Sequence, residues 1–289
     1  MGASSKFYAK LRGYGKELLH RIRTRIAFRN IESKNPALVY QMGKVGSSTV
    51  VRTLEGMKMT GPVVHVHSLA PENVSGNVET LRANPGYLHR HVVTSLTLTN
   101  KKLKWGHFPC KIITLTREPV GRAISFAFED WRRQLSDVWS LQELEPEKMI
   151  ELVLEKLRPG SPHANPEQWF DRELRSVFDI DLMSVPYDFE QGYVTFCRGP
   201  VDVLVIRMED LNRALKSGLA DLLDVEERDI QMRRSNVGKD KKYADLLAEV
   251  KERMTIPSSV SERIWSTDYA QHFYGPDIDH LREKWEEAS

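Results

Sequence analysis

The stretch ALVYQMGKVGSSTVVRTL, residues 37–54, decides the fold. Its apolar run 37–42 predicts a strand buried on both faces, because it lacks the polar alternation of a half-exposed strand. A turn with two glycines follows at 43–48, and apolar residues at helical spacing continue over 50–57. A strand, a glycine-containing turn and a helix in this order are typical of a site where backbone N–H groups bind phosphate.

Three more apolar runs along the chain predict further strands, at 63–67, 111–116 and 203–207. Helical patterns separate them, and Pro119 suits the first turn of the helix after the third run. A surface helix is expected over 140–158, a β-hairpin within 165–200, and helices from 239 onward. We therefore expect an α/β, P-loop-like three-layer fold: a central parallel sheet of about four or five strands flanked by helices on both faces, with a helical C-terminal portion.

The charge of this 289-residue chain is concentrated at its beginning. Residues 1–30 contain eight Lys/Arg and one acidic residue, whereas the whole chain carries only +2. The body is therefore mildly acidic, which argues against nucleic-acid binding. We expect a basic amphipathic helical arm over 1–33 and a single α/β domain over 34–289. The apolar stripe of the arm is Phe7, Leu11, Tyr14, Leu18, Ile22 and Ile26.

Two interpretations of the stripe stay open. The favoured one is a helix packed on the body. The other is docking to an anionic membrane surface or a partner.

Cys110 and Cys197 are expected to be buried thiols in a reducing compartment. The sequence shows no apolar core of a signal peptide and no apolar run of about 18 residues, and Lys6 departs from the myristoylation pattern. A cytoplasmic location is expected, with the basic helix as a route to peripheral membrane contact.

The turn 43–48 is the first candidate site. Its glycines let backbone N–H groups approach phosphate oxygens, the serines add hydroxyl donors, and Lys44 adds a full charge. A Walker A motif would place the lysine directly after the last glycine. Here Lys44 precedes Gly46, so ATP or GTP is the less favoured ligand.

The second candidate site is Arg117 to Ser125. Arg117 ends a predicted strand, at the edge of the sheet where ligands of α/β proteins bind. Arg122 and Ser125 are three residues apart and share a helix face. A guanidinium and a hydroxyl that converge in this way suit a monophosphate.

Together these segments resemble the sulfotransferases that use 3′-phosphoadenosine-5′-phosphosulfate (PAPS). The turn is similar to their 5′-phosphosulfate loop, and Arg117–Ser125 is similar to their 3′-phosphate site. Two further segments are less specifically similar to the family. Residues 204–211 resemble its late strand and Glu-Asp-Leu turn, and residues 233–239 resemble a basic loop that closes over the nucleotide. The resemblance is nearest to carbohydrate sulfotransferases, including bacterial members linked to capsular polysaccharide. The donor-site residues it implies are Gly43, Lys44, Val45, Gly46, Ser47, Ser48, Arg117, Arg122, Ser125, Arg233, Arg234 and Lys239.

The resemblance implies transfer of a sulfuryl group from PAPS to a hydroxyl, with a glycan as the expected acceptor and without a metal ion. Lys44 would stabilise the charge on the leaving oxygen. A histidine is the usual general base near neutral pH. His89-Arg90-His91 resembles the His-x-His segment of uronyl 2-O-sulfotransferases, and His65-Val66-His67 is a second pair, predicted to point to one face of a strand. His91 is our first candidate and His67 the second; some family members use Glu instead.

Two alternatives stay open: a P-loop nucleotide kinase or NTPase, and a sulfotransferase-like protein that binds nucleotide or glycan without turnover. Several other polar and aromatic residues have mainly structural interpretations. Core packing is expected for Trp131, Trp139 and Trp169, and a solvated helix face for Glu129 and Asp130.

Overall fold

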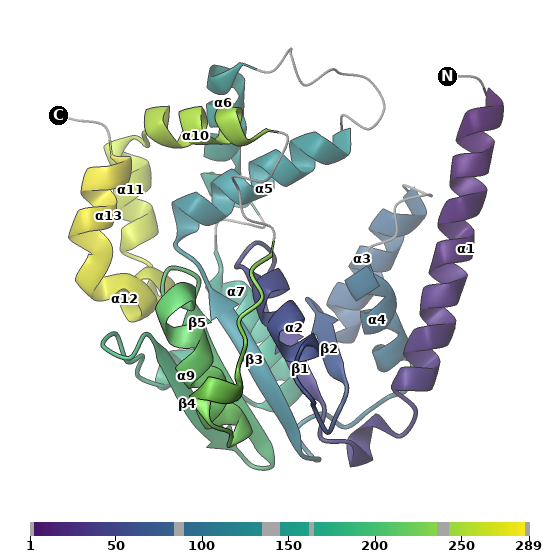
Figure 1. Cartoon of the computed structure of the whole chain (residues 1–289). Coiled ribbons are helices and arrows are strands. Elements are labelled where there is room, and N and C mark those ends of the chain that lie inside the picture. The colour runs from purple at the N-terminus through teal and green to yellow at the C-terminus, as the bar shows by residue number, and fades with distance from the viewer. Residues whose placement is uncertain (1–2, 84–89, 135–144, 162–164, 236–242, 287–289) are drawn as a thin grey trace.

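The computed structural model describes residues 3–83, 90–134, 145–161, 165–235 and 243–286. Within them, a five-stranded sheet has the order β2-β1-β3-β5-β4 (Figure 1). The strands are β1 (Ala37–Tyr40), β2 (Val63–Val66), β3 (Cys110–Thr116), β4 (Tyr193–Arg198) and β5 (Val201–Arg207). Four of them run parallel, and β4 pairs antiparallel with β5. The predicted parallel sheet is confirmed. The hairpin lies later than the range 165–200 expected for it, because β4 pairs with β5, the strand predicted at 203–207.

Helices flank this sheet, as predicted. In the view of Figure 1, α2 and α9 lie in front of it and α7 lies behind. The helices are α1 (Ala3–Ala27), α2 (Ser47–Glu55), α3 (Pro71–Ala83), α4 (Arg90–Thr99), α5 (Pro119–Gln134), α6 (Pro146–Leu157), α7 (Glu167–Trp169), α8 (Ser176–Phe178), α9 (Leu211–Leu223), α10 (Ala244–Arg253), α11 (Ser258–Trp265), α12 (Asp268–Tyr274) and α13 (Ile278–Trp285). A π-helix spans Phe170–Arg175 between α7 and α8.

The position of β1 determines where the site can form. The chain leaves β1 toward β2 on one side, and β3 lies on the other side of β1. A crevice at such a reversal of strand order, beyond the carboxyl ends of the strands, is the usual ligand site of open α/β sheets. The turn after β1 and the segment after β3 both leave the sheet at this edge.

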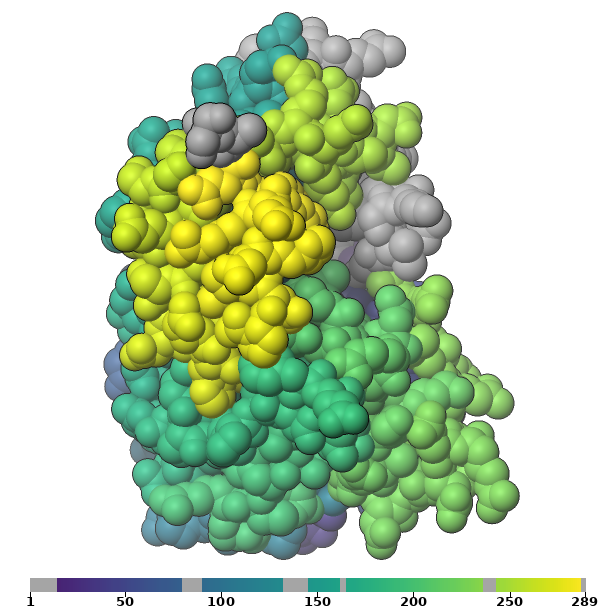
Figure 2. Space-filling model, turned by 90° about the vertical axis from the view of Figure 1, so that its left-hand side faces the viewer, coloured from purple at the N-terminus to yellow at the C-terminus, as the bar shows by residue number. Residues whose placement is uncertain are grey.

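The C-terminal helices complete the core through aromatic contacts. The ring of Phe170 stacks on Tyr269 at 5.9 Å and lies 6.0 Å from Phe273, which also meets Tyr187 at 5.7 Å. Figure 2 shows the yellow C-terminal helices seated directly on the teal and green segment below them. The C-terminal helical portion is therefore part of the same core as the sheet, and its predicted helical character is confirmed.

Two expectations about burial are wrong. Cys197 is exposed, because it lies on the edge strand β4; Cys110 on β3 is buried as expected, and both thiols are free. Leu18, Ile22 and Ile26 of the predicted stripe also stay exposed. Helix α1 does pack on the body, against α4, but with another face: Thr24 and Phe28 are buried, and His20 Nε2 lies 3.2 Å from the carbonyl oxygen of Arg90.

Candidate functional site

The turn between β1 and α2 has the backbone shape of an anion-binding loop. Lys44 and Gly46 both have left-handed backbones, with φ of 69° and 89°. Left-handed residues alternating with right-handed ones turn successive N–H groups toward one point. A left-handed lysine costs about 1 kcal/mol or more and persists only where its surroundings hold it. A Cβ at Gly43 would lie 3.2 Å from the Phe126 ring, so a larger residue there would require that ring to shift.

The ammonium group of Lys44 faces helix α5. Its Nζ lies 3.1 Å from Oε2 of Glu129, and both side chains are largely buried. The neighbouring Asp130 pairs with Lys156 at 2.6 Å. The expectation that Glu129 and Asp130 form a solvated helix face is therefore wrong: each carboxylate neutralises a lysine, and Glu129 holds the charge of the turn in place.

Two arginines of the second predicted segment donate hydrogen bonds to backbone carbonyl groups of the turn. Arg117 Nη1 donates to the carbonyl oxygen of Lys44 at 3.0 Å. Arg122 Nε donates to the carbonyl oxygen of Gly43 at 3.4 Å. The structure thus brings together two segments more than 70 residues apart in the sequence.

Arg122 lies almost entirely inside the protein, at 5% exposure, with its guanidinium 5.1 Å from the centre of the Phe126 ring. Burial lowers its pKa to about 10. A buried cation gains stability from an anion brought to its edge, so Arg122 suits a phosphate ligand. Ser125 lies one turn further along α5 and is half-buried.

The start of α5 is held by the carboxylate of Glu118. Its oxygens accept from Val120 N–H at 2.9 Å and Gly121 N–H at 2.6 Å, which satisfies two donors of the first helical turn. Burial, and then the charge of Glu209, raise the pKa of Glu118 to about 7. Glu209 in turn accepts from the N–H of Glu118 at 3.1 Å. Glu209, in the predicted 204–211 segment, therefore helps to hold the backbone at the start of the second site.

Tyr269 of α12 makes two hydrogen bonds to the backbone of Arg117. Its hydroxyl accepts from the backbone N–H of Arg117 at 3.0 Å and donates to the carbonyl oxygen of the same residue at 2.8 Å. Arg117 is therefore held through its backbone by a helix from the end of the chain. The sequence carries no local signal for this contact.

Three histidines, two from β2 and its extension and one from α4, converge next to the turn. The rings of His65 and His67 lie 5.0 Å apart, and His91 of α4 lies 4.3 Å from His67 and 6.2 Å from His65. His65 and His67 share a face of β2 and its extension, as predicted. The two candidate histidine segments thus form one cluster; His89 lies outside the described residues.

Gln41 links this cluster to the turn and was missed in the sequence. It is fully buried, and its Nε2 lies 3.3 Å from His65 Nε2 and 3.2 Å from His67 Nδ1. Its backbone carbonyl oxygen lies 2.8 Å from His67 Nδ1. Only an N–H can donate to a carbonyl, so Nδ1 of His67 carries the proton and Nε2 is the basic nitrogen. Burial lowers the pKa of His65 to about 4, which keeps that ring neutral.

Glu173 is the second residue without a sequence signal. This fully buried carboxylate of the π-helix accepts from the N–H groups of Leu69 and Ala70 at 2.7 and 3.0 Å, and from the side chains of Tyr40 and Asn73. It joins the end of β1 to the loop after β2. Trp169 adds a bond from its indole N–H to the carbonyl oxygen of His67 at 2.9 Å.

Of the basic loop predicted at 233–239, the structure describes only residues 233–235. Arg233 donates its backbone N–H to Thr53 at 3.0 Å, and its guanidinium lies against Gly56, at the end of α2 away from the turn. Ser235 N–H donates to Thr49 in the first turn of α2 at 3.3 Å. The chain therefore runs along α2 toward the turn, but Arg233 itself does not reach it. Arg234 is exposed, and Lys239 lies outside the described residues.

The described residues contain neither a metal-binding cluster nor a membrane-spanning helix. No group of three or more His, Cys, Asp or Glu side chains among them is arranged to hold a metal ion. None of the helices they form is long and apolar enough to span a membrane.

Comparison with known proteins finds similarity to one protein family and to a solved structure. The family NKWYS, described as "Putative capsular polysaccharide synthesis protein", matches residues 143–275, which is less than half of the chain. That range includes β4, β5 and α9 but neither the turn after β1 nor Arg117–Ser125. A solved structure, the sulfotransferase from Alicyclobacillus acidocaldarius, is 15% identical with a TM-score of 0.33, over 81% of this chain and 95% of that one. No curated protein matches this sequence.

Proposed function

We propose that this protein is an enzyme that transfers the sulfuryl group of PAPS to a hydroxyl group, and that the acceptor is a glycan. The observation that carries the proposal is the hydrogen bond from Arg117 to the carbonyl oxygen of Lys44. It joins a turn suited to a 5′-phosphosulfate to a segment suited to a 3′-phosphate, at the edge of the sheet where α/β proteins bind ligands.

The residues present fit the two phosphate ends of this donor. The N–H groups of the turn, with the hydroxyl groups of Ser47 and Ser48, would bind the 5′ end at the start of α2. Arg122 and Ser125 would bind the 3′-phosphate, and Arg117 would contact both ends. A 3′-phosphate is what separates this donor from ATP, and the buried cation of Arg122 supports it.

Lys44 would supply the electrostatic catalysis. Its ammonium is paired with Glu129, and this ion pair holds it beside the turn. As the bond between sulfur and the 5′-phosphate oxygen breaks, negative charge grows on that oxygen. A fixed cation stabilises this charge more in the transition state than in the ground state.

His67 would be the general base. The acceptor oxygen forms a bond to sulfur, its proton passes to Nε2 of His67, and adenosine 3′,5′-bisphosphate leaves with the electrons of the broken S–O bond. The contact from Nδ1 to the carbonyl oxygen of Gln41 sets the tautomer that this step needs. His91, whose ring lies 4.3 Å from His67, would position it.

The glycan acceptor is supported by a different observation. The family whose model matches residues 143–275 is described by its link to capsular polysaccharide synthesis. Sulfation of a sugar hydroxyl is the reaction that would connect such a role with a PAPS site.

The first experiment is a comparison of nucleotides by thermal shift. Adenosine 3′,5′-bisphosphate should raise the melting temperature more than AMP or ATP does, because only it has both phosphate ends. Transfer of radioactive sulfate from PAPS to polysaccharide acceptors is the second measurement. A larger shift with magnesium-ATP would favour a kinase or NTPase, and tight bisphosphate binding without transfer to any acceptor would favour a binding protein.

A further inference from the structure

Helix α1 presents an apolar surface that the rest of the described protein does not cover. We call Leu18, Leu19, Ile22 and Ile26 the α1 stripe; their exposed fractions are 60%, 47%, 47% and 69%. Apart from Val225, they are the large exposed hydrophobic residues of the described chain. Single exposed apolar residues are ordinary, but four on one side of a helix form a patch that marks an interaction surface.

Cationic residues border the α1 stripe on both sides. Successive residues of a helix are rotated by about 100°. Arg21 and Arg25 therefore lie along one border of the stripe, and Lys16 and Arg23, both exposed, lie along the other. An apolar strip between two rows of cations is the pattern of a helix that lies in the interface of an anionic membrane.

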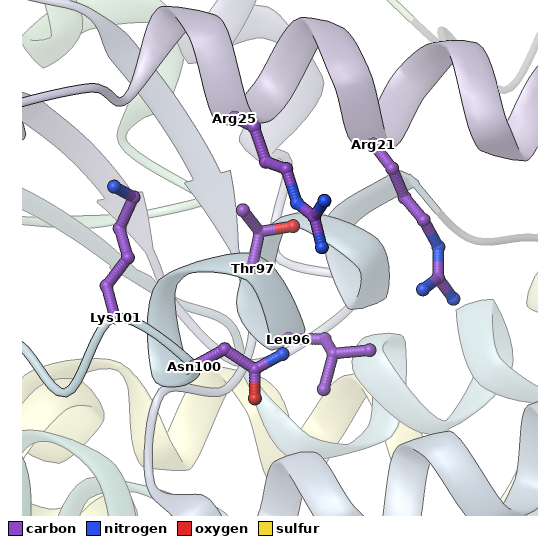
Figure 3. Close-up of a pocket in the computed structure, with 6 residues that line it drawn as sticks. All are labelled: Arg21, Arg25, Leu96, Thr97, Asn100 and Lys101. Atoms are coloured by element: carbon purple, nitrogen blue, oxygen red, sulfur yellow. The ribbon is translucent and has the colours of Figure 1, made fainter.

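A pocket opens on one of these borders, between α1 and α4. Figure 3 shows Arg21 and Arg25 extending from α1 toward the helix that carries Leu96 and Thr97. Asn100 and Lys101 complete the lining. Arg21 is paired with Glu17 at 2.6 Å. No ion pair engages Arg25 or Lys101 within the residues that the structure describes, so this pocket has positive charge available for an anion.

The placement of α1 suits docking on a plane. Figure 1 shows α1 at the outer edge of the molecule, beyond α3 and α4. It is held there by the buried Thr24 and Phe28 and by His20, whose Nε2 lies 3.2 Å from the carbonyl oxygen of Arg90. The stripe points away from this contact, so it can enter a bilayer surface without α1 leaving the body.

We propose that the α1 face docks on a membrane that contains anionic phospholipid. The α1 stripe enters the boundary between headgroups and acyl chains, and the pocket of Arg25 and Lys101 binds a lipid phosphate. The charge of the arm makes an anionic bilayer the occupant that fits, since a second copy of this basic surface would be repelled. The proposal is independent of the sulfotransferase reaction.

The experiment is co-sedimentation of the full-length protein with vesicles. The wild type should bind vesicles of phosphatidylcholine mixed with phosphatidylserine and bind phosphatidylcholine alone far more weakly. High salt should weaken the binding, because exposed charges are screened. Absence of binding to the mixed vesicles, or equal binding to both kinds, would overturn the proposal.

Two double variants test the surface itself. Arg25→Glu with Lys101→Glu should lower the partition coefficient by about tenfold or more, and Ile22→Ser with Ile26→Ser by about as much. Control variants outside α1 and α4 are Arg228→Glu and Val225→Ser, both at exposed residues, and they should change nothing. Circular dichroism checks that each variant is folded.

Sedimentation velocity without vesicles tests whether a second copy of the chain, instead of a membrane, covers the α1 stripe. The wild type and the Ile22→Ser/Ile26→Ser variant should have the same oligomeric state. A dimer that this variant dissociates would assign the α1 stripe to a second copy of the chain, and the membrane proposal would be withdrawn. Control variants that lose vesicle binding as strongly as the test variants would overturn it too.

Discussion

Arg117 donates a hydrogen bond to the backbone carbonyl oxygen of Lys44 over 3.0 Å, and so holds the residue whose left-handed backbone shapes the turn. One guanidinium thus supports the turn after β1 while it lies at the start of the second site. Because Arg117 contacts both segments, its substitution should affect nucleotide binding differently from substitution of Ser125.

Ser125→Ala should weaken binding of adenosine 3′,5′-bisphosphate while leaving AMP binding unchanged. A hydrogen bond to a charged phosphate contributes about 1.5–3 kcal/mol, or roughly ten- to a hundredfold in affinity. Arg117→Ala should weaken both nucleotides, because it also removes the support of the Lys44 carbonyl. Isothermal titration calorimetry measures both. Equal losses for the two nucleotides in Ser125→Ala would remove the 3′-phosphate assignment.

Lys44→Ala should lower kcat about a hundredfold or more, by analogy with the loss of one oxyanion-stabilising donor. Donor affinity should fall less, because the N–H groups of the turn remain. Glu129→Gln is the matched control: it removes the resting partner of the ammonium but keeps the cation. It should bind the donor at least as tightly as the wild type. A folded Lys44→Ala protein with normal kcat would show that this turn is not the phosphosulfate loop.

His67→Ala should lower kcat by about a hundredfold or more and remove the acidic limb of the pH–rate profile, because the base must be unprotonated to act. His91→Ala should retain that limb, with a smaller loss of kcat. The profile of kcat against pH for both variants distinguishes a base from a positioning residue. If only His91→Ala loses the acidic limb, the two roles are exchanged.

The buried carboxyl of Glu118 should make the protein less stable as the pH rises. Its pKa is raised from 4.5 to about 7, first by burial and then by Glu209. Between these two values the folded state holds a proton that the unfolded state has lost, so the free energy of unfolding falls with increasing pH. The decrease is on the order of 3 kcal/mol and is complete above about pH 7.

Denaturant titrations at several pH values test this decrease. Glu118→Gln cannot ionise, so its free energy of unfolding should vary less across this range than that of the wild type. The exposed Glu226, changed to Gln, is the control and should keep the wild-type slope. An unchanged slope in Glu118→Gln would assign the pH dependence to other buried carboxyls, such as Glu209 or Glu173.

The local pattern of the sequence was sufficient for the strands, the turn and the start of α5. Apolar runs without alternation predicted the parallel strands, and Pro119 marked the first turn of a helix, because these signals depend on neighbours in the chain. The order of the two candidate phosphate sites also predicted their position at one edge of the sheet, since parallel strands end on the same side.

Only the tertiary structure decided which residues meet. Glu129 was expected in solvent and pairs with Lys44, while Gln41 and Glu173 gave no signal at all. The exposed side of α1 could not be told from its buried side, because an apolar stripe has the same spacing whether protein or lipid covers it. Likewise, His67 directly follows β2 and His91 lies on α4, and their 4.3 Å approach depends on how those elements pack. Contacts between elements distant in sequence are set by the packing of the whole core, which no local pattern encodes.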